Sequence, residues 1–129
     1  MATQLKAVIF DVDGTLAETE RNGHRIAFNR AFLDAGLDWN WDEALYGKLL
    51  AVTDGKERIR YFLTDFNSDF KYDGDMDQFI VDLHVSKNKH YVDLIENQVI
   101  SLRPGIRRMM NGLRCAGLRM AIATTTAPA

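Results

Sequence analysis

The chain has 129 residues, of which 47% are hydrophobic and 26% are charged, and its formal net charge is −2. This length and composition fit one modest globular domain with a real core and leave too little chain for two comfortable ones. The small negative charge provides no basic field, so we expect neither nucleic acid nor a membrane as a partner. The single cysteine, Cys115, has no internal partner, and we expect it to be a small apolar residue of a helix.

The N-terminal segment lacks the features of an export signal. Its apolar part is short and ends at Asp11. No apolar run along the chain approaches the ~20 residues of a membrane span. The simplest expectation is a cytoplasmic protein.

The chain begins with a predicted strand and a predicted helix. The apolar run at 7–10 contains β-branched residues and predicts a buried strand. From about residue 22 the apolar positions, including Phe28 and Phe32, recur at helical spacing. Gly36 is well placed to end that helix.

Three further helices are predicted by their start signals. Each begins with a polar residue followed three positions later by Glu or Gln, which is the spacing of a capping box. The pairs are Asn40–Glu43, Asp54–Glu57 and Asp75–Gln78. Apolar residues follow each pair at helical spacing, and the last helix continues to Ile95. We expect Trp39 and Trp41, which flank the first of these caps, to pack in the core.

A last helix and a second strand follow. Pro104 suits the first turn of a helix whose Met109 and Met110 we expect to fill the core. Gly117 ends that helix, and the run 118–123 predicts a strand. The helical stretch between the two strands is too long for a simple βαβ crossover. The order therefore predicts an α/β core, residues 1–17 and 101–129, with an inserted helical cap, residues 18–100.

The ends of the two predicted strands carry residues suited to phosphoryl chemistry. Ligands of open α/β sheets bind beyond the carboxyl ends of the strands, where Asp11 and Thr124 lie. Asp11 and Asp13 are two apart and face the same way, and Gly14 allows a tight turn. A divalent cation such as Mg²⁺ would offset their repulsion. Asp11 could then attack phosphorus, with Asp13 as general acid and base and Thr124 binding phosphoryl oxygens.

The alternative is a plain Asp-Gly turn that the two carboxylates merely cap. We favour the chemical interpretation because a strand comes directly before the pair and a Thr-ended strand follows the helical stretch. The run FDVDGTL also resembles the first signature of the haloacid dehalogenase-like phosphohydrolases, and the helical stretch looks like their helical cap subclass. Further runs, DVDGTLAETE, HRIAFNRAF, GLDWNW, TDGKERI, LRPGI and IATTT, resemble the CbbY-like sugar-phosphate phosphatases along nearly the whole chain.

The resemblance implies a Rossmann-like core with a helical cap and a Mg²⁺-dependent phosphatase that works through an aspartyl phosphate. It implies a phosphorylated sugar as substrate, such as xylulose-1,5-bisphosphate. Asp11 corresponds to the nucleophile and Asp13 to the general acid and base. Both correspond to Mg²⁺ ligands, Asp13 through its main-chain oxygen.

The resemblance extends to residues around these carboxylates. The phosphate-binding residues that it implies are Gly14, Thr124 and Thr125. The hinge and cap positions that it implies near the substrate are Glu18, Thr19, His24, Tyr46, Lys56 and Lys87. For the last four of these, a solvated or core role is an equal alternative.

This sequence departs from its relatives in two places. Relatives usually read TGGKER, where this chain has Asp54, whose carboxylate could repel a substrate phosphate or cap a helix; we favour the cap. Relatives also continue beyond the position of Ala129 with a phosphate-neutralising Lys, an acidic pair of the metal site and further strands. We therefore expect an incomplete core sheet, weak Mg²⁺ binding, slow or absent turnover, and uncovered apolar edges that favour self-association.

Three other classes compete with this interpretation. The chain could be a non-catalytic binding or assembly fragment whose core strands pair with another chain. It could be a phosphotransferase like the β-phosphoglucomutases. A phosphoacceptor receiver domain shares the acidic cluster, but it lacks a cap-sized insertion after the first strand.

Overall fold

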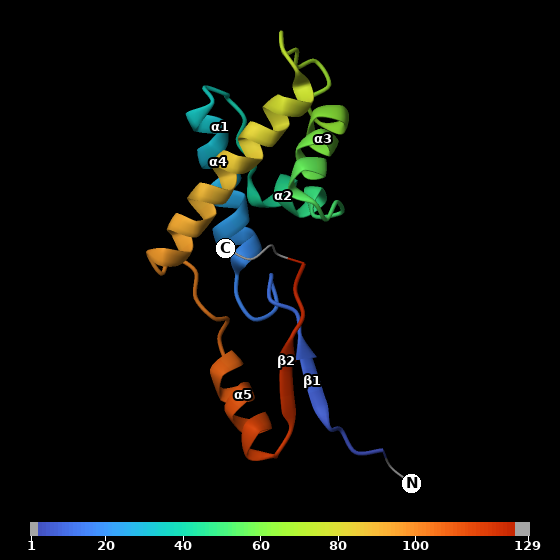
Figure 1. Cartoon of the computed structure of the whole chain (residues 1–129), viewed down its shortest axis with the longest axis vertical. Coiled ribbons are helices and arrows are strands. Elements are labelled where there is room, and N and C mark those ends of the chain that lie inside the picture. Colours follow the sequence, from blue (N-terminus) through green and yellow to red (C-terminus); the bar gives the residue numbers. More distant parts are fainter. Residues whose placement is uncertain (1–2, 126–129) are drawn as a thin grey trace.

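The computed structural model describes residues 3–125. Its elements, in chain order, are β1 (Ala7–Phe10), the π-helical turn η1 (Glu20–His24), α1 (Arg25–Asp34), α2 (Glu43–Leu49), α3 (Gly55–Asp65), α4 (Met76–Glu96), α5 (Ile106–Cys115) and β2 (Arg119–Ile122). The molecule is elongated, with η1 and α1–α4 at one end and β1, β2 and α5 at the other (Figure 1). No helix within the described part of the chain is both long and apolar enough to cross a membrane.

The two strands form a parallel pair. Ala7 lies opposite Arg119, and Phe10 lies opposite Ile122. A parallel pair needs a crossover connection, and here η1 and α1–α5 all lie within it. The carboxyl ends of both strands point toward the helical end (Figure 1). This arrangement confirms the α/β class and, within residues 3–125, the incomplete two-stranded sheet.

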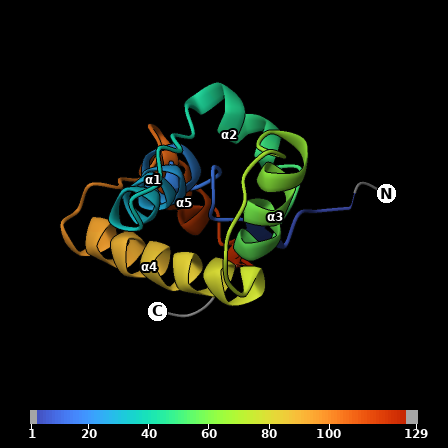
Figure 2. The ribbon, with the colours of Figure 1, turned by 90° about the horizontal axis from the view of Figure 1, so that it is seen from above.

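The core of the helical end is aromatic. Trp41 is fully buried, and its ring centroid lies 4.7 Å from that of Phe28, 4.9 Å from that of Phe32 and 5.3 Å from that of Phe62. The Asn29 side chain fixes the loop that carries Trp41, because it donates to the Trp41 carbonyl (2.9 Å) and accepts from its N–H (2.7 Å). The predicted packing role of Trp41 is confirmed. Seen from above, α4 lies along one side of α1 and reaches α3 (Figure 2).

Helix capping agrees with the sequence at two of three sites. The Asp54 carboxylate accepts from the first-turn N–H groups of α3 at 2.8 and 3.3 Å. Asp75 does the same for α4 at 2.9 and 3.1 Å. The prediction of Asn40 as the cap of α2 is wrong: Asp42 caps that helix and accepts from Leu45 N–H at 2.7 Å. Asp42 stands directly before the first helical residue, where a short carboxylate reaches the free N–H groups.

Two expectations about α5 are also wrong. Pro104 precedes the first turn, because Gly105 is the N-cap and adopts a left-handed conformation (φ 84°). The helix has no buried residue, Met109 is 42% exposed and Cys115 is exposed. Within residues 3–125 only two short strands lie at this end, so the apolar side of α5 finds too little surface to be buried.

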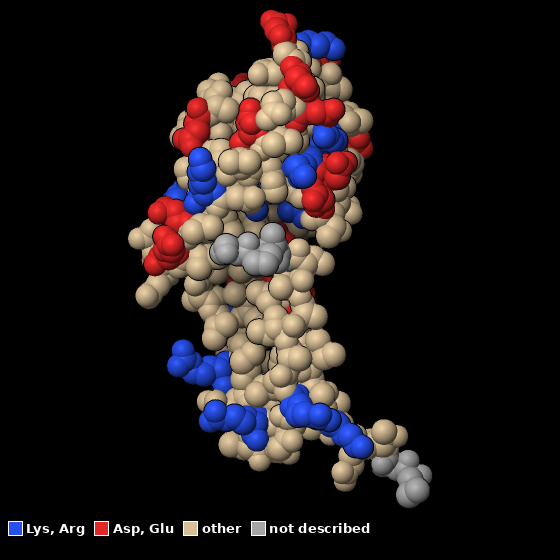
Figure 3. Space-filling view, viewed as in Figure 1, with Lys and Arg blue, Asp and Glu red and all other residues tan. Residues whose placement is uncertain are grey.

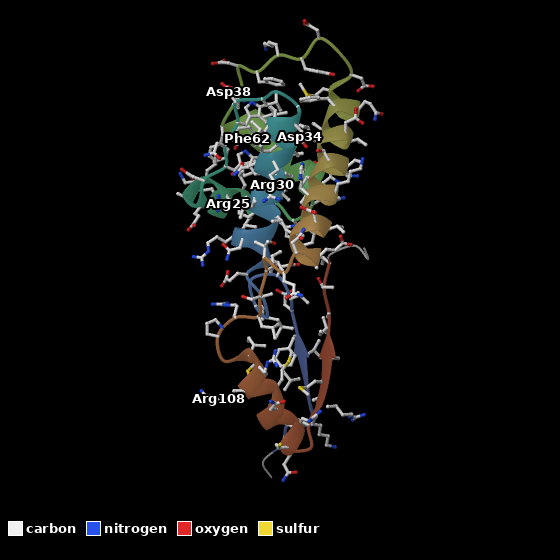
Figure 4. All side chains as sticks on the ribbon, turned by 90° about the vertical axis from the view of Figure 1, so that its left-hand side faces the viewer. Arg25, Arg30, Asp34, Asp38, Phe62 and Arg108 are labelled. Atoms are coloured by element: carbon white, nitrogen blue, oxygen red, sulfur yellow. The ribbon has the colours of Figure 1, made fainter. Side chains whose placement is uncertain are left out.

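The charges divide between the two ends of the molecule. Segment 97–125 contains arginines and no Asp or Glu, whereas most acidic residues belong to the helices and loops between 18 and 96. In the space-filling view, blue atoms gather around α5 and the strands, and red atoms gather over the helical end (Figure 3). Arg108 on α5 lies far from Asp34 and Asp38 at the opposite end (Figure 4).

Candidate functional site

The loop after β1 turns back on itself and presents the two predicted carboxylates. The Val12 carbonyl accepts from three consecutive backbone N–H groups, those of residues 15–17, at 3.1, 3.0 and 3.3 Å. Gly14 adopts φ 72°, a conformation that favours glycine. Asp11 is exposed at the carboxyl end of β1, and its Oδ2 accepts from the Thr15 hydroxyl at 3.2 Å. The structure therefore places Asp11 where a ligand of the sheet would bind.

Asp13 turns toward the helical end. Its Oδ1 accepts from the Thr19 hydroxyl at 2.6 Å and lies 3.5 Å from Nε2 of His24. Thr19 and His24 are both buried. Three residues that the sequence nominated are thus brought together, with Asp13 held by the two residues at the start of the helical segment.

His24 is held in a neutral form beside Asp13. Its ring stacks on Tyr91 at a centroid distance of 3.9 Å and an interplanar angle of 12°. Gly23 permits this approach, because a Cβ at that position would lie 3.0 Å from the Tyr91 ring. Burial, with a contribution from the Lys87 charge, lowers the pKa of His24 to about 4. At neutral pH the imidazole is uncharged, and with the proton on Nε2 it would donate toward Asp13.

A buried polar network stands behind Glu20. The Tyr46 hydroxyl donates to Oε2 of Glu20 at 2.6 Å, and Nη1 of Arg58 donates to the Tyr46 oxygen at 2.9 Å. Arg58 is anchored by two further hydrogen bonds to the Val52 carbonyl, at 3.1 and 2.9 Å. Tyr46 and Arg58 are 2% and 6% exposed, and burial raises the pKa of Tyr46 above its ordinary value. The sequence nominated Tyr46 and missed Glu20 and Arg58.

Lys87 supplies a buried cation to the same region. The residue is 6% exposed, and its Nζ lies 5.2 Å from the ring centroid of Phe28 and 5.1 Å from that of Tyr91. Burial lowers the pKa of Lys87 to about 8, with the Arg58 charge acting in the same direction. Lys87 thus lines the same cavity as His24, and its role near a substrate stays a prediction.

These groups surround one cavity of about 870 Å³ between the strand ends and the helices. Its walls come from the loop after β1, from η1, from Phe28 of α1, from α3 with the residues before it, from α4, and from the end of the described chain after β2. Among the nominated residues, those that line it are Asp13, His24, Lys87 and Thr125. The predicted site residues that do not line the cavity are Asp11, Gly14, Glu18, Thr19, Tyr46, Lys56 and Thr124. Thr19 and Tyr46 lie behind the cavity wall. Thr19 is hydrogen-bonded to the lining residue Asp13, and Tyr46 is hydrogen-bonded to the lining residue Glu20.

Asp54 belongs both to a helix cap and to the cavity wall. Burial opposes its ionisation, but hydrogen bonds from the N–H groups of Lys56 and Glu57 outweigh it and lower the pKa of Asp54. Next to it, Gly55 lets His84 approach, since a Cβ there would lie 2.7 Å from His84 Nε2. Asp54 therefore fulfils the predicted capping role while also presenting its side chain to the cavity.

The connection between the two ends of the molecule contains an arginine that was not among the predicted site residues. Nη1 of Arg103 donates to the Gly14 carbonyl at 2.6 Å, and its Nε lies 3.0 Å from Glu18. The Arg103 N–H also donates to the Leu16 carbonyl at 2.8 Å. The carboxylate of Glu18, which we expected near the substrate, is therefore paired with Arg103.

One group of side chains has the spacing of a metal site. Asp13, Glu20 and His24 each offer a ligand atom, and these atoms lie within 4.8 Å of one another. Two cations, Arg58 and Lys87, stand beside this group and oppose a metal ion there. Among the described residues Asp11 is not part of this group.

Residues 5–129 match the family described as hydrolase, haloacid dehalogenase-like hydrolase. The chain is 46% identical to Protein CbbY of Rhodobacter capsulatus over 123 residues, covering 95% of this chain and 52% of that protein. It is 44% identical to Protein CbbY, plasmid, of Cupriavidus necator over 125 residues, covering 97% and 49% respectively. The chain thus spans about half the length of the curated relatives it matches.

Solved structures agree with this sequence similarity. CbbY from Rhodobacter sphaeroides in complex with phosphate superposes with a TM-score of 0.75 at 44% identity, covering 96% of this chain and 52% of that one. A mutant of the same protein in complex with xylulose-(1,5)bisphosphate gives a TM-score of 0.76 at the same identity and coverage. With its strand-end carboxylates, its helical insertion and these matches, the chain belongs to the haloacid dehalogenase-like hydrolase family.

Proposed function

We propose that this chain carries part of the active site of a Mg²⁺-dependent phosphatase that acts on a phosphorylated sugar. One observation carries the proposal: Asp13 from the end of β1 and Thr125 from beyond the end of β2 line the same cavity as His24 and Lys87 from the helices. The relative solved with a bisphosphate sugar, at 44% identity, supports this substrate class. In this proposal residues 1–17 and 101–129 hold the phosphoryl group, and the cap, residues 18–100, selects the rest of the substrate.

Asp11 is the proposed nucleophile. Its exposed carboxylate at the strand end would attack phosphorus and form an aspartyl phosphate, while the bond to the leaving oxygen breaks. Asp13 would donate a proton to that oxygen and then take one from the water that hydrolyses the aspartyl phosphate. The hydrogen bond from Thr19 and the neutral ring of His24 support a fixed position for Asp13.

The phosphoryl group needs donors and positive charge around it. We propose that the Thr124 hydroxyl and the backbone N–H of Thr125 bind its oxygens. The Gly14 N–H donates to the Ala17 carbonyl at 2.9 Å, so Gly14 would contribute by shaping the loop beside the phosphoryl group. Lys87 lies in the cavity wall and Lys56 lies in the first turn of α3, so both could attract the anionic substrate.

The residues at the strand end fit a magnesium ion. Asp11 offers a hard carboxylate oxygen, which is the ligand type that Mg²⁺ prefers. The Asp13 carboxylate is engaged by Thr19 and His24, so its main-chain oxygen is the proposed second ligand. A bound Mg²⁺ would offset the negative charge that the two carboxylates and the phosphoryl group bring together.

The test is hydrolysis of p-nitrophenyl phosphate by the 129-residue chain with Mg²⁺. We expect slow turnover that Asp11→Asn and Asp13→Asn abolish, while Asp38→Asn, an exposed residue at the far end of the helical part, leaves it unchanged. Turnover that survives Asp11→Asn would rule out the aspartyl phosphate. Absence of turnover in the wild type, with intact folding, would show that this chain alone does not complete the active site.

A second candidate function is assembly with another chain through the strand end. Ile9 and Ile122 are 70% and 60% exposed, and α5 buries none of its residues. Apolar strands and helix faces left uncovered in this way favour association. Light scattering distinguishes the two candidates, because a compact monomer with phosphatase activity would contradict the assembly function.

A further inference from the structure

We propose that Glu20 recognises a substrate hydroxyl on the carbon next to the phosphate ester, so that the cavity selects vicinal hydroxy phosphate esters. This inference rests on the proposed function and adds the substrate feature that the cap recognises. Sequence reasoning assigned no role to Glu20.

Glu20 lies close to Asp13. A carboxylate oxygen of Glu20 lies within 4.8 Å of a carboxylate oxygen of Asp13, and both residues line the cavity. The distance between these two oxygens is shorter than the summed length of two hydrogen bonds of about 2.8 Å each. If Asp13 protonates the leaving oxygen, Glu20 is within reach of the oxygen on the adjacent carbon.

Glu20 is held in place before a substrate arrives. Its Oε2 accepts from Tyr46, and Nη1 of Arg58 lies 3.8 Å away. Arg58 in turn is fixed to the Val52 carbonyl. The Glu20 side chain is still 23% exposed, so the carboxylate is rigid and accessible at once. A group positioned in advance loses little conformational freedom on binding.

The charges around Glu20 determine the kind of ligand that it can bind. A carboxylate only accepts hydrogen bonds, so Glu20 calls for a donor and repels a second phosphate. A metal ion is disfavoured because Arg58 and Lys87 stand beside the group. A neutral hydroxyl donor satisfies both conditions, and phosphorylated sugars carry such hydroxyls.

The experiment compares two esters that differ only in that hydroxyl, 2-hydroxyethyl phosphate and ethyl phosphate. Each is titrated into the 129-residue chain with Mg²⁺ while amide chemical shifts are followed by NMR. We expect the hydroxylated ester to bind roughly tenfold more tightly, the range of a hydrogen bond to a charged group. Glu20→Ala should remove the preference, and Tyr46→Phe, which releases the carboxylate, should reduce it. Glu96→Gln, which removes an exposed carboxylate at the end of α4, should preserve it.

The outcomes separate this inference from the proposed function. Equal affinity of the two esters for the wild type overturns the role of Glu20 and leaves the phosphate site intact. Binding of neither ester overturns both proposals. A preference that survives Glu20→Ala also overturns the role of Glu20. If Glu20→Ala does not fold, Glu20→Gln keeps the shape of the side chain, and the preference must then fall below about threefold.

Discussion

Replacing Lys87 by Met should stabilise the fold, although it removes a residue of the candidate site. Lys87 is 6% exposed, and burial lowers its pKa from 10.5 to about 8. The folded chain therefore binds this proton more weakly than the unfolded chain does. Below pH 8 both states carry the proton, so the fold bears the full cost of a buried charge there. Methionine keeps an unbranched chain against the rings of Phe28 and Tyr91.

The size of the effect follows from the pKa difference. At about 1.4 kcal/mol per unit, a fall from 10.5 to about 8 corresponds to about 3 kcal/mol at pH 7. The substitution also removes the cation–π contacts of Lys87 with Phe28 and Tyr91, which costs about 1 kcal/mol of stability. We expect Lys87→Met to raise the free energy of unfolding by about 2 kcal/mol at pH 7. The advantage should shrink as pH rises from 8 toward 10.5, because the folded wild type then loses its proton.

Urea denaturation at pH 7 and pH 9.5 measures both the size and the sign. Lys71→Met is the matched control, since Lys71 is exposed in a loop and should change stability by less than about 0.5 kcal/mol. Destabilisation by Lys87→Met at pH 7, or a stability advantage that grows with pH, would show that the buried Lys87 charge does not destabilise the fold.

Three further predictions concern single residues. Asp75→Ala removes the cap of α4 and should cost about 1 kcal/mol in urea denaturation, whereas Asp73→Ala in the exposed loop should be nearly neutral. Ile59→Val removes one methylene group from a fully buried site and should cost about 1 kcal/mol; no loss would mean that the core is looser than described. The His24 ring should stay neutral down to about pH 4, and stability should fall as pH drops from 6.5 toward 4 because only the unfolded chain gains the proton there. NMR of the ring checks this, and protonation near pH 6 would contradict it.

Features set by neighbours in the sequence could be predicted. Helical periodicity and nearby carboxylates located α3 and α4 and their caps at Asp54 and Asp75, and the apolar run located β1. The cap of α2 was misplaced because Asn40 and Asp42 are both good capping residues, and only the backbone geometry separates them. The exposure of α5 depends on what lies beside it, which periodicity does not report.

The same distinction holds for the candidate site. Asp13, Thr19 and His24 lie within one short segment, so a motif resemblance could nominate all three, and their roles stay predictions. The contact of Glu20 with Tyr46 joins residues 26 positions apart, and Arg58 joins Tyr46 across 12. In the sequence, Glu20 stands among other polar residues and Arg58 follows a helix cap. Neither can be told apart from an exposed charged residue until the tertiary packing is known.

The ends of β1 and β2 form the proposed phosphate site, which faces the helical cavity. The most direct test is to titrate inorganic phosphate with Mg²⁺ into the 129-residue chain and follow the backbone amides by NMR. We expect shifts concentrated at residues 11–15 and 123–125, reduced by Asp11→Asn. Shifts confined to the arginine-bearing segment 103–119, or the same pattern in Asp11→Asn, would contradict it.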